Sequence, residues 1–322
     1  MFIGLCGPIC AGKKTVSAYL VDHHGFTQLF LESPLSSKTT PDDYTFPTAS
    51  ALVDYVTKHW QGRWVTTDVY SESILDKLSC RPFFILISVD APVNVRWKRF
   101  KQRLNASDPT AEGPSLEEFI FGSDEHLYNP ASGLLPLISR ATIRLLNTSS
   151  DLAHLYASLG KLDLTNQELL RPSWDQYFMQ LASLAAQRSN CMKRRVGCVV
   201  VRDKRVISTG YNGTPRGHRN CGDGGCPRCN EGIGSGVGLG TCLCIHAEEN
   251  ALLEAGRDRI REGSILYCDT CPCLTCSIKI VQVGISEVVY SQGYCMDKDT
   301  AAVFKESGVL LRQFLPVRIN SP

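Results

Sequence analysis

The stretch that decides the fold is His246-Ala247-Glu248, followed by Pro272-Cys273-Leu274-Thr275-Cys276, in which Cys273 stands 27 positions after His246. One imidazole and two thiolates are ligands that Zn²⁺ accepts while a fourth position stays open. The two cysteines are spaced i and i+3, so they share one face of a helix's first turn, where the helix dipole stabilises thiolates. Zinc lowers the pKa of a bound water, and a carboxylate beside it can carry that proton to a leaving group. The pattern predicts a metal site formed by His246, Cys273 and Cys276, with Glu248 as the catalytic proton shuttle.

The two motifs, H-x-E followed by C-x-x-C, are a more specific signal together than either motif is alone. A lone C-x-x-C also occurs in redox pairs and structural zinc knuckles, and a lone H-x-E carries little information. Together, with Pro272 before the first cysteine, they match the signature of zinc nucleobase deaminases. A structural knuckle would have no need of an acid at Glu248, so a catalytic site is favoured.

Composition bounds the remaining possibilities. With 322 residues, at about 150 residues per domain, the chain is expected to form two domains. Its 34 basic and 32 acidic residues leave a net charge of +2, which provides no basic field for stable nucleic-acid binding. The longest apolar run, 83–89, is too short to cross a membrane. Residues 1–5 lack the features of a signal peptide, so we expect a cytoplasmic protein, with the nucleus as a second location.

The pattern of apolar residues predicts two α/β domains, 1–165 and 166–322. In the first domain, strands alternate with helices predicted over 13–23, 50–59, 93–103 and 150–159. The continuous apolar run 83–89 suits a parallel strand that is buried on both faces. In the second domain, Ser173 is expected to cap a helix that runs to about residue 188. Strands over 196–201 and 205–211 follow, and then a loop, 210–240, in which 11 of 31 residues are glycine. Further helices are predicted near 246, over 273–283 and over 298–307, and strands over 264–268, 287–290 and 310–314.

The loop Gly7-Pro8-Ile9-Cys10-Ala11-Gly12-Lys13-Lys14-Thr15 resembles a Walker A phosphate-binding loop. It follows a predicted strand and opens a predicted helix, and Gly7, Gly12 and Lys13 are its candidate phosphate-binding residues. Lys14, however, stands where the Mg²⁺-coordinating Ser or Thr belongs. Residues 89–103 resemble the strand and basic helix of small nucleotide kinases. We therefore expect a P-loop nucleotide-kinase-like α/β domain that is degenerate, serving as a phosphate-binding relic or regulatory module.

The second domain closely resembles the deoxycytidylate (dCMP) deaminases, especially the fungal form, from about residue 187 to residue 314. The residues that carry the resemblance are Arg188-Ser189-Asn190-Cys191, Gly210-Tyr211-Asn212-Gly213-Thr214-Pro215, His246-Ala247-Glu248-Glu249-Asn250-Ala251, Leu266 to Cys276, Gly284 to Ser291, and Tyr294.

This resemblance implies a cytidine-deaminase-like three-layer α/β/α fold and hydrolytic deamination of dCMP to dUMP and ammonia, which supplies dUMP for thymidylate synthesis. It also implies activation by dCTP with Mg²⁺, inhibition by dTTP, and a homo-oligomer, with a hexamer as one form. Asn212 would hydrogen-bond the substrate, although Asn-Gly is also a common turn. Tyr294 would lie near the active site, with core packing as the alternative.

The remaining cysteines suggest a second, structural zinc. An odd total of 15 in a chain without a secretory signal argues against a disulfide framework. Cys226-Pro227-Arg228-Cys229 is another C-x-x-C, and Cys191 and Cys221 stand where phage relatives of the family place structural-zinc ligands. The candidate ligands are therefore Cys191, Cys221, Cys226 and Cys229. In the alternatives, Cys242 and Cys244 replace two of these, or the thiols bind no metal.

Three other functions compete with a nucleotide deaminase. A polynucleotide deaminase acting on tRNA or DNA has the same zinc chemistry but calls for a basic groove. A nucleotide kinase with a zinc scaffold, or a zinc-binding module without activity, would not require Glu248.

Overall fold

The computed structural model describes residues 1–322 except 33–43, 108–112, 150, 235–236, 294–296 and 316–322. The chain divides into two compact units, one covering Met1–Arg171 and the other beginning at Pro172. No helix in the described parts of the chain is long and apolar enough to cross a membrane.

The first unit contains a five-stranded sheet of order β2-β5-β1-β6-β7, in which every neighbouring pair is parallel. The central strands carry apolar side chains on both faces, as parallel strands covered by helices require. One buried cluster includes Ile3, Leu5 and Leu155, and the cluster on the other face includes Phe2, Leu52 and Leu75. The strands are β1 (Phe2–Cys6), β2 (Thr27–Gln28), β5 (Trp64–Thr66), β6 (Phe84–Asp90) and β7 (Ile143–Leu146), and a separate parallel pair joins β3 (Phe30–Leu31) to β4 (Thr45–Phe46).

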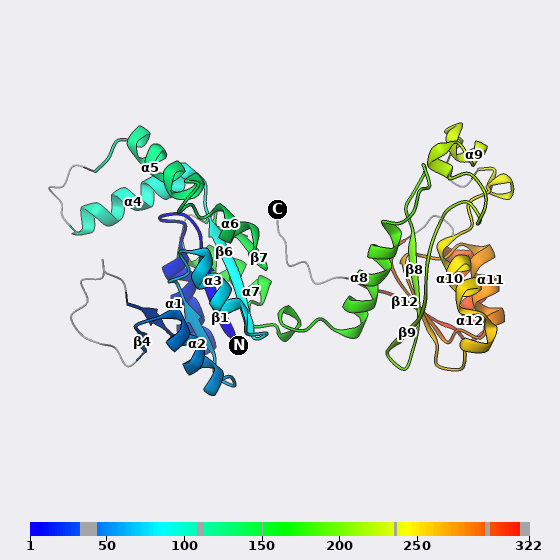
Figure 1. The fold of residues 1–322 in the computed structure, drawn as a ribbon, viewed down its shortest axis with the longest axis horizontal. Helices are drawn as coiled ribbons and strands as arrows, with labels where there is room; N and C mark the ends of the chain where they lie inside the picture. The colour runs from blue at the N-terminus through cyan, green and yellow to red at the C-terminus, as the bar shows by residue number, and fades with distance from the viewer. Residues whose placement is uncertain (33–43, 108–112, 150, 235–236, 294–296, 316–322) are drawn as a thin grey trace. The chain divides into compact units, whose positions relative to one another are not determined.

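The described residues of the first unit form seven α-helices, which are labelled in Figure 1. The expected helices over 13–23, 50–59, 93–103 and 150–159 are confirmed, with shifts at their ends. Three further helices, α3, α5 and α6, lie where no helix was predicted from the sequence. The bounds are α1 (Lys13–His24), α2 (Ala49–Lys58), α3 (Glu72–Ser79), α4 (Val93–Ser107), α5 (Leu116–Tyr128), α6 (Leu135–Ser139) and α7 (Leu152–Leu162).

The second unit contains a five-stranded sheet of order β12-β11-β10-β8-β9. The pairs β8–β9 and β8–β10 are antiparallel, whereas β10–β11 and β11–β12 are parallel. All of the strands predicted from the sequence are present. Their bounds are β8 (Gly197–Arg202), β9 (Arg205–Tyr211), β10 (Ile265–Thr270), β11 (Glu287–Gln292) and β12 (Leu310–Gln313).

Helices cover both faces of this sheet and make three layers (Figure 1). Helix α8 packs Phe178, Met179 and Ala182 on one face, and the opposite face buries Ala251 of α10 and Ile280 of α11. The helices are α8 (Trp174–Ala186), α9 (Pro227–Asn230), α10 (Ala247–Ala255), α11 (Leu274–Val283) and α12 (Asp297–Glu306).

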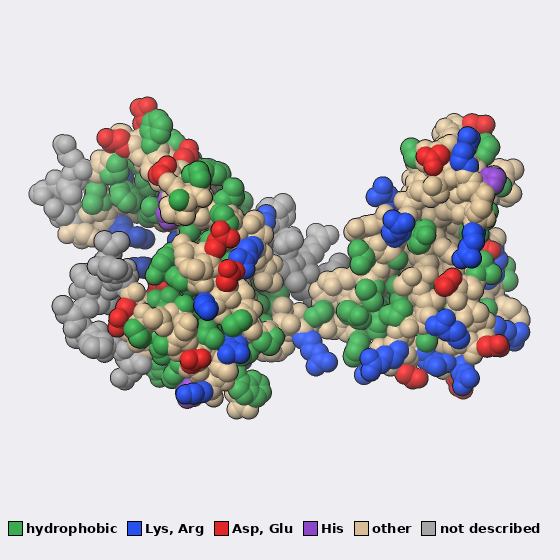
Figure 2. All heavy atoms as spheres, viewed as in Figure 1, with side chains coloured by type: hydrophobic (Ala, Val, Ile, Leu, Met, Phe, Trp, Pro, Cys, Tyr) green, Lys and Arg blue, Asp and Glu red, His purple; other side chains and the backbone are tan. Residues whose placement is uncertain are grey.

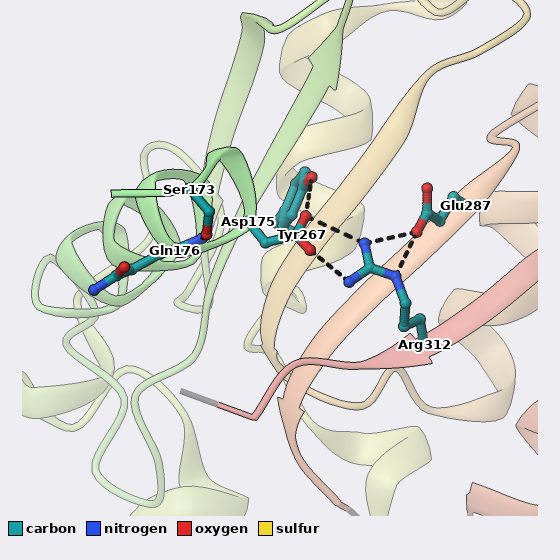
Figure 3. A network of polar contacts seen from close by, with 6 residues as sticks. All are labelled: Ser173, Asp175, Gln176, Tyr267, Glu287 and Arg312. Carbon is teal, nitrogen blue, oxygen red and sulfur yellow. Dashed lines mark hydrogen bonds and ion pairs between the residues drawn. The ribbon is translucent and has the colours of Figure 1, made fainter. Parts of the chain in front are cut away.

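A polar network fastens α8 to three strands (Figure 3). Ser173 caps α8 by accepting a hydrogen bond from the backbone N–H of Gln176. Arg312 on β12 donates to Asp175 at 2.5 and 3.2 Å and forms an ion pair with Glu287 at 2.8 Å. The Tyr267 hydroxyl donates to Asp175 at 2.8 Å. These hydrogen bonds hold the pKa of the Asp175 carboxyl below its usual range, with the Arg312 contact as the largest cause.

Candidate active site and metal sites

Two helix N-termini bring the predicted zinc ligands together. His246 is the N-cap of α10, Cys273 is the N-cap of α11, and Cys276 lies in the first turn of α11. The Nδ1 atom of His246 lies 3.3 Å from the Sγ atom of each cysteine. The three ligand atoms lie within 4.8 Å of one another. This spacing and donor set could hold one metal ion.

Local packing fixes the position of these ligands. Gly210 on β9 lies against α10 so closely that an added Cβ would come within 2.1 Å of the Ala247 carbonyl oxygen. Glycine is therefore needed for α10 to approach the sheet. On the other side, the buried Thr300 hydroxyl donates to the Pro272 carbonyl at 2.9 Å, and Ser277 donates to the Cys273 carbonyl at 2.9 Å. These bonds fix the turn that presents Cys273.

The charge state of the cysteines suits a soft metal ion. A hydrogen bond from Cys276, with a further contribution from His246, lowers the pKa of the Cys273 thiol to about 3. The same interaction raises the pKa of Cys276. The lowered pKa of Cys273 favours the thiolate form, which is the form that binds a metal ion. Sulfur and imidazole donors are those that Zn²⁺ prefers, so the residues fit this ion.

Glu248 is buried beside the three ligands, with 4% of its surface exposed. Burial raises the pKa of its carboxyl group to about 7. It lines one cavity together with His246, Cys273 and Asn212. A carboxyl group buried in this way can exchange protons with a molecule in the cavity.

Asn212 reaches this cavity from the loop after β9. Paired hydrogen bonds between Gly213 and Ile245 hold that loop beside His246. The Asn212 side chain accepts from the backbone N–H of Val196 and donates to the Arg194 carbonyl, both at 2.8 Å. Because an amide can make four hydrogen bonds, one N–H and one lone pair of Asn212 stay free of these two contacts. Tyr294, the other predicted substrate contact, lies outside the described residues.

The remaining predicted cysteines gather in one cluster, but not as the predicted set of four. Two sets have all of their Sγ atoms within 4.8 Å: Cys191, Cys221, Cys229 and Cys244, and then Cys226, Cys229, Cys242 and Cys244. The expected quartet of Cys191, Cys221, Cys226 and Cys229 is therefore not a compact set, because Cys226 lies with Cys242 instead. Cys242 and Cys244, immediately before His246, belong to the cluster. The set of Cys226, Cys229, Cys242 and Cys244 corresponds to the alternative in which Cys242 and Cys244 replace two of the predicted ligands.

Cationic side chains border the same cavity. Lys193, Arg194 and Arg228 line it together with Glu248. Arg228 is 6% exposed and donates from Nε to the Val237 carbonyl at 2.8 Å. Lys193, in the basic run Lys193-Arg194-Arg195, and Arg228 could not be assigned a role from the sequence, because basic side chains are most often solvated.

In the first unit, residues 7–13 form a closed loop between β1 and α1. Gly7 has a φ of 135°, and an added Cβ would lie 2.0 Å from the Val89 carbonyl oxygen. Gly12 is the N-cap of α1. Lys13 donates from Nζ to the carbonyls of Gly7 at 2.5 Å and Pro8 at 3.1 Å, and burial lowers its pKa. The loop thus brings its lysine back over its own backbone.

A family model of known proteins matches the second unit. Residues 172–292 match the family model described as the cytidine and deoxycytidylate deaminase zinc-binding region. This range contains His246, Glu248, Cys273 and Cys276. The fold and the site together define a zinc-dependent deaminase.

Full-length relatives extend the match to the first unit. The deoxycytidylate deaminase of Schizosaccharomyces pombe is 48% identical over 318 residues, covering 98% of this chain and 97% of the relative. That of Saccharomyces cerevisiae is 47% identical and covers 98% of this chain and 96% of the relative. The chain belongs to the deoxycytidylate deaminase family. A dCMP deaminase from the cyanophage S-TIM5, solved with dCMP and dUMP, is 32% identical, with 45% of this chain and 98% of that chain covered and a TM-score of 0.37.

Proposed function

We propose that this protein hydrolyses dCMP to dUMP and ammonia. The observation that carries this proposal is the buried Glu248 beside His246, Cys273 and Cys276, in a chain of the deoxycytidylate deaminase family. A purely structural zinc site is closed by four protein ligands and has no open position that a buried carboxyl group could serve. The same carboxyl group argues against a kinase with a zinc scaffold.

Each residue has a role in the reaction. His246, Cys273 and Cys276 would hold zinc, which, when bound, acts as a Lewis acid and lowers the pKa of water. In the overall reaction a C–O bond forms at C4 of cytosine, the C4–N bond breaks, and one water is consumed for each ammonia released. Glu248 would take one proton from the attacking water and give it to N3, and it would then take the remaining proton of that oxygen and pass it to the departing amine. Asn212 would bind the deoxyribose through its remaining hydrogen-bonding capacity.

We assign recognition of the 5′-phosphate to the cations that border the cavity. Lys193 and Arg194 lie on the segment before β8, and both line the cavity that contains Glu248. Lysine and arginine bind phosphate through charge-assisted hydrogen bonds. A nucleotide would thus be preferred to a nucleoside. Figure 2 shows both basic and acidic side chains on the visible face of each unit, and the net charge of +2 does not favour a polynucleotide substrate, which calls for a basic groove.

A substrate panel tests the proposal. Purified full-length protein is incubated with deoxycytidine, dCMP, dCTP and a short single-stranded oligonucleotide, and the uracil product and ammonia are measured. We expect dCMP to be the preferred substrate. Arg194→Ala should raise KM for dCMP more than for deoxycytidine, and Arg205→Ala, an exposed arginine on β9, is the matched control. Preferential deamination of the oligonucleotide would contradict the proposal.

We also propose that the first unit is a P-loop nucleotide-kinase-like domain that binds a nucleotide phosphate without transferring it. The parallel sheet and the loop at residues 7–13, with Lys13 held over it, support phosphate binding. Lys14 at the position of the Mg²⁺ ligand argues against transfer. Such a unit could sense dCTP with Mg²⁺ as activator and dTTP as inhibitor. We further propose a homo-oligomer, with a hexamer as the specific form, which light scattering on the purified protein would test.

A further inference from the structure

Six cysteines from three segments converge beside the active site. Cys191 precedes β8, Cys221, Cys226 and Cys229 lie in and around α9, and Cys242 and Cys244 precede His246. The two compact sets of four share two members, Cys229 and Cys244. Cys191 and Cys221 belong only to the first set, and Cys226 and Cys242 belong only to the second.

The sulfur–sulfur distances match tetrahedral metal sites. The Sγ atom of Cys229 lies 3.9 Å from that of Cys191, 3.8 Å from that of Cys242 and 4.0 Å from that of Cys244. Cys226 and Cys242 are 3.9 Å apart. A zinc–sulfur bond of about 2.3 Å gives a tetrahedron with an edge of about 3.8 Å, whereas a disulfide bond is about 2.05 Å long. The observed spacings therefore fit ligands around an ion and exclude formed disulfides between these pairs.

We propose that the six cysteines hold two zinc ions, bridged by the thiolates of Cys229 and Cys244. The first ion would take Cys191 and Cys221 as terminal ligands, and the second would take Cys226 and Cys242. Four terminal and two bridging thiolates give each ion four sulfur ligands, as a closed structural site requires. A single four-cysteine site would leave two of the six thiols without metal.

The surroundings suit such a cluster. Six thiolates around two divalent ions leave two negative charges. The buried guanidinium of Arg228 lies close enough to Cys242 and Cys229 for electrostatic interaction with both, and it would offset part of this charge. Backbone N–H groups also point at terminal ligands, including that of Met192 at 3.4 Å from the Cys221 sulfur. Hydrogen bonds to the ligands are the usual support around protein metal sites.

The proposed cluster also has a structural task. Residues 210–240 include 11 glycines, and ordering such a segment costs much conformational entropy. Metal binding can offset this cost. Cys244 lies two residues before His246, and Cys191, Cys229, Cys242 and Cys244 line the cavity that contains Glu248. The cluster would thus position one wall of the active site. The proposal of this cluster rests on the arrangement of the cysteines and does not depend on the proposed reaction.

Metal counting tests the proposal. Native mass spectrometry of the full-length protein should give three zinc ions per chain, one at His246, Cys273 and Cys276 and two in the cluster. The variant Cys273→Ser/Cys276→Ser should retain two. The variant Cys229→Ser lacks a bridging ligand and should lose both cluster ions, so that one zinc ion per chain remains. Replacement of Cys80, an exposed cysteine of the first unit, in Cys80→Ser should leave all three zinc ions. Two zinc ions or one in the unmodified protein, or copper in place of zinc, would overturn the proposal.

A second measurement distinguishes a bridged pair from two separate ions, and it does not depend on whether Cys229→Ser folds. In protein reconstituted with ¹¹³Cd, we expect two resonances typical of four-thiolate coordination, coupled to each other through the bridging sulfurs. Two uncoupled resonances would contradict the bridge. Three zinc ions per chain without turnover of dCMP would contradict the proposed function and leave the cluster supported.

Discussion

Glu248 is the residue on which turnover should depend most directly. Its carboxyl group is buried beside the three zinc-ligand candidates, and no other carboxyl group lines their cavity within the described residues. Replacement by glutamine keeps the shape and removes the proton shuttle, so Glu248→Gln should lower kcat by a factor on the order of 10² to 10⁴. Zinc content is measured beside turnover, and it should be unchanged.

The matched control is Glu254→Gln, an exposed glutamate on the same helix, α10. It should keep the normal rate. A near-normal rate in Glu248→Gln with full zinc content would show that another group moves the protons.

Asn212 should affect both stability and substrate binding. Its side chain forms hydrogen bonds with the backbone of Val196 and Arg194, and both residues border the cavity. Asn212→Ala leaves the half-buried backbone N–H of Val196 without its partner, so it should lower the free energy of unfolding by about 1–2 kcal/mol and raise KM for dCMP. Urea unfolding and steady-state kinetics are the measurements, with the exposed Asn105→Ala as control. An unchanged unfolding free energy would mean that these hydrogen bonds contribute nothing net.

The residues of the active site differ in how far the sequence alone could predict them. His246, Cys273 and Cys276 occupy helix N-termini, where short motifs determine both conformation and direction, so their convergence could be predicted. Which of the other cysteines come together could not be predicted, because a glycine-rich loop has no periodicity that determines which residues meet. Cys226 has its partners in Cys229, Cys242 and Cys244, and this depends on the path of the whole loop.

Among the elements, helix α8 depends on one ion-paired network (Figure 3). Arg312 joins Asp175 at the start of α8 to Glu287 on β11. Hydrogen bonds to charged groups contribute about 1.5–3 kcal/mol, and partial exposure of Arg312 reduces this, so Arg312→Gln should destabilise the protein by about 1–2 kcal/mol. Urea unfolding at neutral pH measures the loss, with Arg205→Gln on β9 as control.

The same network should make stability depend on pH. The pKa of Asp175 is lowered in the folded state from its usual value of 3.8, chiefly by the hydrogen bond from Arg312. A carboxyl group with a lowered folded-state pKa contributes its stabilisation above the unfolded pKa and loses it as the pH falls through the folded one. The difference in unfolding free energy between the unmodified protein and Arg312→Gln should therefore be constant from about pH 5 to 7 and shrink below about pH 4. A difference that grows on acidification would contradict this account.

The regular elements also separate into those that apolar periodicity predicts and those that it does not. The strands of the second unit and helices such as α8 have buried apolar faces, and their bounds were predicted within a few residues. Helix α5 was not predicted, because only two of its residues, Phe119 and Ser123, are buried. Its signal is the capping box between Ser115 and Glu118, which determines where the helix begins without any apolar periodicity.

At the scale of the whole molecule, one chain combines a deaminase unit with a unit whose loop resembles a phosphate-binding loop. The relatives that match almost the whole chain are also deoxycytidylate deaminases, so the first unit belongs to this fungal type of chain. Arg99 on α4 donates to the Ala11 carbonyl at 3.1 Å and to the Ser149 carbonyl at 2.9 Å. The side chains of Lys13 and Arg99 thus donate hydrogen bonds to carbonyl groups of the loop. Both side chains are cations that could bind an anion instead.

The last prediction concerns what this loop binds. If the first unit binds a triphosphate, Lys13 loses its bonds to Gly7 and Pro8 and gains stronger, charge-assisted bonds to phosphate. Lys13→Ala should therefore weaken binding of dCTP, dTTP or ATP with Mg²⁺ to the full-length protein by about tenfold or more, which is about 1.4 kcal/mol. Equilibrium dialysis measures this, and Lys14→Ala, the exposed neighbouring lysine, should bind normally. Because Lys14 replaces the Mg²⁺ ligand, no phosphate transfer from ATP to dCMP or dUMP is expected. Equal affinity in Lys13→Ala would contradict phosphate binding by the loop, and transfer that Lys13→Ala abolishes would show that the unit is a working kinase.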